Sequence, residues 1–113
     1  MQGHRDLKVW QKSMDLVTEI YAATATFPKH EMFGLSQQLR RAAVSVPSNL
    51  AEGHGRSSRK EFHQYVSQAR GSLCEVETQL EIARNLKYIL ARAGEVAKML
   101  NGLREWAKKR TDS

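Results

Sequence analysis

The sequence holds a single cysteine, Cys74, among its 113 residues. An internal disulfide needs two cysteines and a cysteine-based zinc site needs several, so both are excluded. The opening MQGHRDLKVW lacks the apolar run of a secretory signal peptide. No stretch approaches the roughly 20 consecutive apolar residues that a membrane-spanning helix requires. We therefore expect a soluble protein of the reducing cytoplasm.

Proline is also scarce, since only Pro28 and Pro47 occur, and β-branched residues are few. The composition is dominated by Ala, Leu, Glu, Gln, Lys and Arg, which are the residues that favour helices. A chain of this length suits one domain, which buries roughly two thirds of its unfolded surface without cross-links. These features predict a single all-α domain over residues 1–113.

Apolar residues recur every three or four positions in four segments, which we assign to helices at about residues 5–25, 34–54, 58–87 and 93–110. The apolar stripe of the first helix contains Leu7, Trp10, Met14, Val17 and Tyr21, widened by Leu16 and Ile20. The stripe of the third helix runs from Phe62 to Leu86. Four amphipathic helices joined by short turns predict an antiparallel up-down-up-down four-helix bundle.

Pro47 falls inside the second segment, where its ring would clash with the carbonyl of Ala43. The apolar spacing nevertheless continues to Leu50 and Ala51, which favours one kinked helix. Two short helices are the alternative. Gly53 suits the left-handed residue that closes a helix.

The third segment carries signals at its start and in its middle. Ser58 and Glu61 form a capping box, in which the serine oxygen accepts the N–H of the third helical residue. Gly71 and Ser72 are small residues in mid-helix, which indicates that another helix approaches closely there. The turn into the fourth helix is expected near residues 88–93, where no proline marks it.

Charge is unbalanced, with 18 Lys and Arg against 12 Asp and Glu and a net charge of +6. Such a balance favours nucleic acid, an acidic protein or an anionic lipid as partner, although it also serves solubility. The candidate phosphate contacts are basic residues of the second and third helices and the C-terminal segment: Arg40, Arg41, Arg56, Arg59, Lys60, Arg70, Lys108, Lys109 and Arg110.

Each part of this basic set has a plainer interpretation. Arg40 and Arg41 point about 100° apart on a helix, so that one of them faces solvent and the other faces a subunit boundary or a neighbour on the side of Glu52. We expect one of the two to have a structural role in an ion pair. Residues 53–58 lie at a helix N-terminus that would attract anions, or they form only a capped turn. The cluster at residues 108–110 interacts favourably with the negative end of a helix and aids solubility.

No catalytic constellation can be named. The four histidines are spread over different elements: His4, His30, His54 and His63. No GxSxG motif occurs, and Gly34 stands where a zinc motif HExxH would need its second histidine. His54 and His63 could meet near Glu52 or Glu61, but exposed turn histidines are the simpler interpretation. We expect no enzymatic activity, no cofactor and no metal.

The run GLSQQLRRAAVSVPSNLAEGHGR at residues 34–56 resembles the signature of four-helix-bundle proteins first noted as open reading frames in intervening sequences of bacterial 23S ribosomal RNA genes. The segments DLKVWQKSMDLV and ARGSLCEVETQLEIARNLKYI resemble the first and third helices of that family. The resemblance spans about residues 6–103 and implies a homopentameric ring. It also implies kinship with the accessory protein of diversity-generating retroelements, which partners a reverse transcriptase and binds nucleic acid.

Three hypotheses follow for the function. The first is a non-enzymatic homo-oligomeric adaptor with affinity for RNA or DNA regardless of sequence, because phosphate contacts carry no sequence information. The second is a ring that docks an acidic protein, such as a reverse transcriptase, without touching nucleic acid itself. The third is a small enzyme, for which no paired nucleophile and base can be identified.

Overall fold

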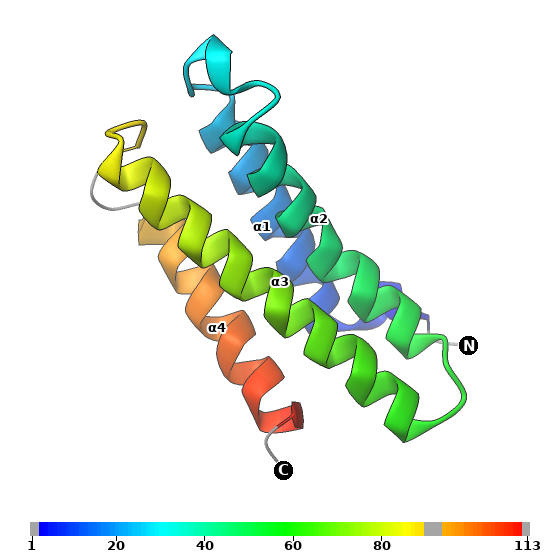
Figure 1. The fold of residues 1–113 in the computed structure, drawn as a ribbon. Helices are drawn as coiled ribbons and strands as arrows, with labels where there is room; N and C mark the ends of the chain where they lie inside the picture. The colour runs from blue at the N-terminus through cyan, green and yellow to red at the C-terminus, as the bar shows by residue number, and fades with distance from the viewer. Residues whose placement is uncertain (1–2, 90–93, 112–113) are drawn as a thin grey trace.

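The computed structural model describes residues 3–89 and 94–111 (Figure 1). Within these ranges lie four helices, α1 (Lys8–Thr24), α2 (Leu35–His54), α3 (Arg59–Asn85) and α4 (Gly94–Thr111). Short 3-10 turns at His4–Asp6 and Lys29–Glu31 precede α1 and α2, and the described ranges hold no strand. The predicted all-α fold is therefore confirmed. Residues 90–93 of the expected last turn lie outside the described residues.

The four helices form a bundle in which each helix packs against two others. α2 contacts α1 and α3, and α4 contacts α1 and α3, whereas the diagonal pairs do not meet in the described ranges. Figure 1 shows α2 and α3 side by side and antiparallel, with the start of α1 and the end of α4 at the same end of the bundle as the turn that joins them. We call this end, at residues 55–58, the turn end. The opposite end, at residues 25–34 and 86–89, is the loop end.

One apolar core extends along the bundle and draws on all four helices. Its members include Leu16 and Ile20 of α1, Leu39 and Leu50 of α2, Leu73 and Val76 of α3, and Leu100 and Leu103 of α4. Burial of these side chains is the main favourable term that holds the four helices together.

The predicted stripe of α1 is partly wrong. Met14 and Tyr21 are 42% and 44% exposed, while Ser13 and Thr24 are buried in their place. The two buried hydroxyls each donate to a carbonyl of their own helix at 2.7 Å, from Ser13 to Trp10 and from Thr24 to Ile20. These local hydrogen bonds remove most of the cost of burying a hydroxyl, so Ser13 and Thr24 can lie on the inner face of α1. The apolar pattern treats hydroxyl residues as outward-facing, and it therefore assigned Met14 and Tyr21 to that face instead. Leu86, just after α3, is also exposed rather than buried.

α2 continues through Pro47 as one helix, so the alternative of two short helices is excluded. The prediction for Gly53 is wrong, because it lies buried inside α2 and no described glycine has a positive φ. A Cβ built on Gly53 would lie 2.7 Å from the Cβ of Tyr65 on α3. Gly53 therefore serves the close approach of α2 to α3 rather than a change of chain direction.

The close approach predicted at the Gly71–Ser72 pair is confirmed at Ser72 and not at Gly71. Gly71 is exposed, with open space where a Cβ would stand, whereas Ser72 is buried against α2. The Ser72 hydroxyl donates to the Ser45 hydroxyl at 2.7 Å, and Ser45 also accepts from the Asn49 amide at 2.9 Å. These hydrogen bonds fix the position of α3 along the axis of α2.

Both ends of α3 are capped. At its start the N–H of Glu61 donates to Ser58 Oγ at 3.1 Å, which confirms the serine half of the predicted capping box. The Glu61 carboxylate also reaches back, but it accepts from the Ser58 hydroxyl at 3.1 Å. At its end Lys87 adopts a left-handed conformation with φ 65°, and the N–H groups of Lys87 and Tyr88 donate to the carbonyls of Arg84 and Ala83. This closure is a Schellman motif with lysine where glycine is usual.

We expect Gly53→Ala to lower the free energy of unfolding by about 1–3 kcal/mol, because the new methyl group overpacks the contact with Tyr65. Urea denaturation measures this change. Gly102→Ala is the matched control, since Gly102 lies in α4 with open space around it. The control should raise stability by roughly 0.5–1 kcal/mol. Equal effects of the two substitutions would show that the α2–α3 contact does not depend on glycine.

Candidate nucleic-acid interface

A basic groove of about 550 Å³ lies at the turn end, between the first turns of α3 and the last turn of α4. Seven residues line it: Arg59, Lys60, His63, Gln64, Ser67, Arg110 and Thr111. The set contains three permanent cations and no carboxylate. We call this surface the basic groove.

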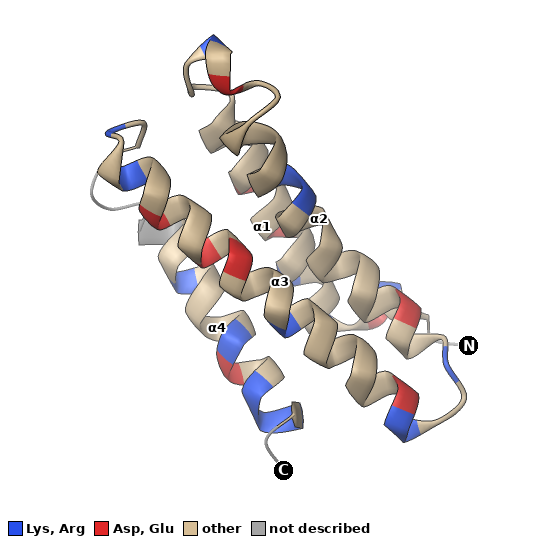
Figure 2. Ribbon diagram, viewed as in Figure 1, with Lys and Arg blue, Asp and Glu red and all other residues tan. Residues whose placement is uncertain are grey.

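The basic groove joins predicted residues that lie far apart in the sequence. Arg59 and Lys60 come from the start of α3, and Arg110 comes from the end of α4. The side chains of Arg59 and Lys60 are exposed and make no hydrogen bond or ion pair with any described residue. Figure 2 shows basic segments at the first turn of α3 and along the last turns of α4. The two cations are thus available to an anion from outside.

The other basic residues of this end border the groove. The Arg110 guanidinium stacks over the Trp106 ring at 4.1 Å and donates to the Trp106 carbonyl at 3.2 Å. Arg70 donates to the Thr111 hydroxyl, which ties α3 to the last turn of α4. Lys108 and Lys109 are exposed on the same turn of α4. The predicted C-terminal cluster and the start of α3 therefore form one basic end.

Arg56 occupies a more confined position than the sequence indicated. Its Nη2 donates to Glu52 Oε2 and to the Tyr65 hydroxyl, both at 2.8 Å, and its guanidinium stacks on the Tyr65 ring. The interaction with the Tyr65 hydroxyl is the largest cause that raises the pKa of Arg56 above its usual value, and the charge of Glu52 adds a smaller part. Its charge faces a carboxylate, so Arg56 acts first as a tie across the α2–α3 turn.

Arg40 and Arg41 lie outside the basic groove, in the half of α2 nearer the loop end. Arg40 Nε donates to the Thr24 hydroxyl at 2.7 Å and its guanidinium stacks on the Tyr21 ring at 4.6 Å. Its role is structural, through a hydroxyl and a ring rather than the ion pair considered from the sequence. The Arg41 side chain is exposed and makes no hydrogen bond or ion pair in the described part of the chain. The structure thus divides the predicted basic residues between two surfaces.

Sequence reasoning missed the polar residues of the groove. His63, Gln64 and Ser67 follow Lys60 at intervals of three, four and seven residues, and therefore share its side of α3. Helical spacing counted from Lys60 could have found them, since the spacing gives polar faces as well as apolar ones. What the spacing does not give is the partner helix, because only packing decides that α4 ends beside this face.

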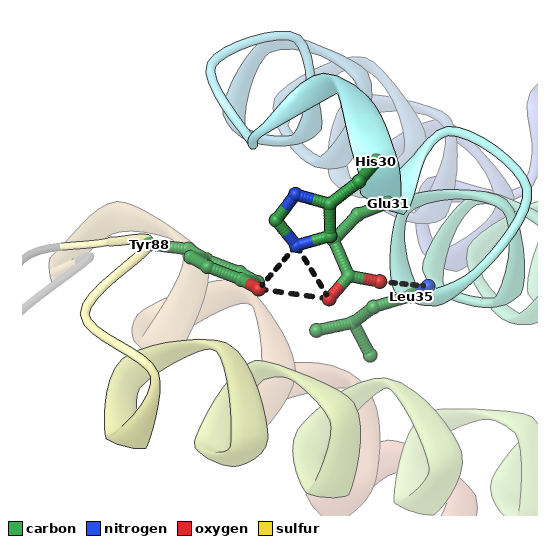
Figure 3. A network of polar contacts seen from close by, with 4 residues as sticks. All are labelled: His30, Glu31, Leu35 and Tyr88. Carbon is green, nitrogen blue, oxygen red and sulfur yellow. Dashed lines mark hydrogen bonds and ion pairs between the residues drawn. The ribbon is translucent and has the colours of Figure 1, made fainter.

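A second polar cluster lies at the loop end (Figure 3). The Tyr88 hydroxyl donates to Glu31 Oε2 at 2.8 Å, and Glu31 Oε1 accepts the Leu35 N–H at 3.0 Å. His30 Nε2 lies 3.3 Å from the Tyr88 hydroxyl. This cluster caps α2 with the Glu31 carboxylate and joins the α1–α2 loop to the segment after α3. We call it the loop clasp.

In the loop clasp the pKa values of Glu31 and Tyr88 are both displaced away from neutral pH. The Leu35 N–H, followed by the Tyr88 hydroxyl, lowers the pKa of Glu31, and the bond to Glu31 raises the pKa of Tyr88. A general acid or base works best with a pKa near the working pH. Glu31 stays ionised and Tyr88 stays protonated, so the clasp suits a structural tie and not proton transfer.

The described residues contain no group of three or more His, Cys, Asp or Glu side chains that could hold a metal ion. His54 and His63 therefore do not gather with Glu52 or Glu61 into such a site. No helix within the described ranges is long and apolar enough to cross a membrane.

The family described as 23S rRNA-intervening sequence protein matches residues 5–109 of the chain. The match covers all four helices almost completely, and it agrees with the resemblance drawn from the run at residues 34–56. No curated protein matches the chain.

We expect the loop clasp to make stability depend on acid pH. The pKa of Glu31 is lowered from its ordinary value of 4.5, so its contribution is complete above that value and is lost as pH falls through the lower folded pKa. Glu31→Gln should therefore destabilise the protein at neutral pH and have a shrinking effect in acid. Urea denaturation across the acid range measures this. Asp15→Asn is the control, because Asp15 is exposed with no partner among the described residues. An effect of Glu31→Gln that is constant with pH contradicts the assignment.

Proposed function

Because the chain belongs to the family of 23S rRNA-intervening sequence proteins, we propose that it is a non-enzymatic, homo-oligomeric adaptor that binds nucleic-acid backbones through its basic groove. The carrying observation is the lining of that groove, with Arg59, Lys60 and Arg110 and without a carboxylate. The ligand class is RNA or DNA, recognised by its phosphates rather than by its sequence.

The chemistry of the groove supports contact with phosphate. Arg59 and Lys60 have no partner among the described residues, so a polyanion meets them without first breaking an ion pair. Gln64 and Ser67 add neutral donors that can bond to phosphate oxygens. Each cation that replaces a counterion on the backbone contributes to affinity in a way that falls with salt.

The aromatic residues support binding without sequence preference. Single-stranded bases are usually read by exposed rings on which they stack. The ring beside the groove belongs to Trp106, and it is half-buried under the Arg110 guanidinium. The groove itself contains no Phe, Tyr or Trp. Its contacts are therefore electrostatic and directed to the backbone.

Homo-oligomers multiply such a groove. The family resemblance implies a pentamer, in which five copies of a +6 chain would concentrate positive potential. Linked copies turn the second and later contacts into intramolecular ones, so weak phosphate contacts add up to useful affinity. A monomeric groove of three cations would bind far more weakly.

We expect Arg59→Ala/Lys60→Ala to weaken binding to a labelled RNA and to a labelled DNA duplex alike. Loss of two phosphate contacts per groove lowers the slope of log affinity against log salt by about two per occupied groove. Fluorescence anisotropy between about 50 and 200 mM salt measures both quantities.

Lys8→Ala/Lys12→Ala is the matched control, since both lysines are exposed on α1 and outside the groove. It removes the same charge and should change affinity much less. Equal losses would mean that net charge alone acts and that the groove assignment is wrong. No binding by the unaltered protein at the lower salt would contradict the proposal. It would favour an acidic protein, such as a reverse transcriptase, as the partner of this surface, with capture after nuclease treatment as the next measurement.

A further inference from the structure

Exposed apolar side chains gather toward the loop end, away from the basic groove. Tyr21 of α1, Met32 and Phe33 of the α1–α2 loop, and Val44 of α2 are exposed, and Phe33 is 85% exposed. These side chains belong to one open pocket of about 530 Å³. A contiguous apolar surface of this kind, rimmed by polar residues, indicates an interaction site.

This pocket also contains Arg41, whose guanidinium has no hydrogen bond or ion pair in the described part of the chain. We call the surface of Tyr21, Phe33, Arg41 and Val44 the Arg41 face. Tyr, Phe, Met and Arg are the residues enriched in protein–protein interfaces, and lysine is depleted there. The pocket contains Tyr, Phe, Met and Arg side chains and no lysine. Its composition therefore fits a protein partner better than a nucleic-acid backbone.

A second, different surface lies on α3 and the residue that follows it. Ile82 and Leu86 are 43% and 51% exposed. Glu75 precedes Ile82 by seven residues, so it lies two turns away on the same side of the helix. Glu75 is exposed and has no ion pair among the described residues. We call these three residues the Glu75 face. It offers apolar contact beside a negative charge, which complements the Arg41 face.

The two faces match in height along the bundle. The Ser45–Ser72 hydrogen bond sets the register of the antiparallel helices α2 and α3. Arg41 and Glu75 accordingly line one shallow groove between these helices, at the same height. Because both helices rise by the same amount per residue, Leu35, the first residue of α2, falls at about the height of Ile82 on α3. Phe33 and Leu86 lie just beyond these two helix ends, on the same side of the register.

We propose that the Arg41 face of one copy of this chain packs on the Glu75 face of the next copy in a closed ring. The inference rests on the homo-oligomer of the proposed function and names its contact surfaces. In a ring whose axis runs along the bundles, successive copies are not shifted along that axis. Residues of equal height therefore meet, which pairs Phe33 with Ile82 and Leu86, and Arg41 with Glu75.

The positions of the two faces on the bundle allow successive copies to close into a ring. The Arg41 face covers the outer side of α2 toward α1, and the Glu75 face lies on α3 toward α2, so the two look out from neighbouring sides of the bundle. Two unlike faces make a heterologous contact, which generates a small ring when their directions differ by a moderate angle. All copies then point the same way, and every basic groove lies on one rim, where a nucleic acid can touch several.

Phe33→Ser tests the apolar half of the contact. We expect light scattering at micromolar concentration to give a multiple of 12.8 kDa for the unaltered protein and 12.8 kDa for the variant. The fold of each copy should persist, because Phe33 is already exposed in the single chain. Far-ultraviolet circular dichroism checks this. A variant that keeps the full mass overturns the assignment of the Arg41 face.

Arg41→Glu and Glu75→Arg test the charged half. Each single reversal places like charges together and should reduce the assembled mass, whereas the double variant Arg41→Glu/Glu75→Arg should restore it. Lys98→Glu is the control, because Lys98 is exposed on α4 and belongs to neither face. It should leave the mass unchanged. Single reversals that leave the mass intact, or a double variant that fails to recover it, contradict the pairing.

The outcomes separate this inference from the proposed function. A monomeric unaltered protein overturns the oligomer and with it both faces. An oligomer that survives all the face variants overturns only the faces and leaves the basic groove untouched. If Phe33→Ser lost nucleic-acid affinity while keeping its full mass, the Arg41 face would be a nucleic-acid surface and the proposed contact with a second copy would be wrong.

Discussion

The close packing of α2 on α3 is the constraint on which the rest of the structure depends. Gly53 leaves no side chain between α2 and Tyr65, and the Ser45–Ser72 hydrogen bond fixes how far one helix slides along the other. A shift by one turn would separate Arg41 from Glu75 and would leave a buried hydroxyl unpaired, which costs stability. This single register sets the height of every surface residue on the two central helices.

The bundle has two unlike ends. The basic groove lies at the turn end, where α3 begins beside the last turn of α4, and the exposed apolar residues lie toward the loop end. This separation suits the proposed ring, in which copies pack side by side through surfaces away from the basic groove and a polyanion meets the turn end. Copies can then join without bringing their groove cations into the contact, where burying unpaired charge would be costly.

The loop clasp shows why a polar cluster need not be a catalytic site. His30, Glu31 and Tyr88 are residue types that carry acid–base chemistry elsewhere, yet here the Glu31 carboxylate is committed to the Leu35 N–H and the Tyr88 hydroxyl. Those hydrogen bonds hold the pKa of Glu31 low and that of Tyr88 high. The cluster stabilises the two connections at the loop end, with its carboxylate and its phenol both held away from neutrality.

The sequence by itself determined the helical class, the four helices, the capping box at Ser58 and the family, because these follow from local propensity, spacing and an unusual run of residues. It misplaced Met14, Tyr21, Gly53 and Gly71, whose surroundings depend on neighbouring helices. It also named the basic residues without grouping them. Only the tertiary structure places Arg110 beside Arg59 and Lys60, and Arg41 in one groove with Glu75. Helical spacing fixes which side of a helix a residue occupies, but the contacts between helices decide what that side faces.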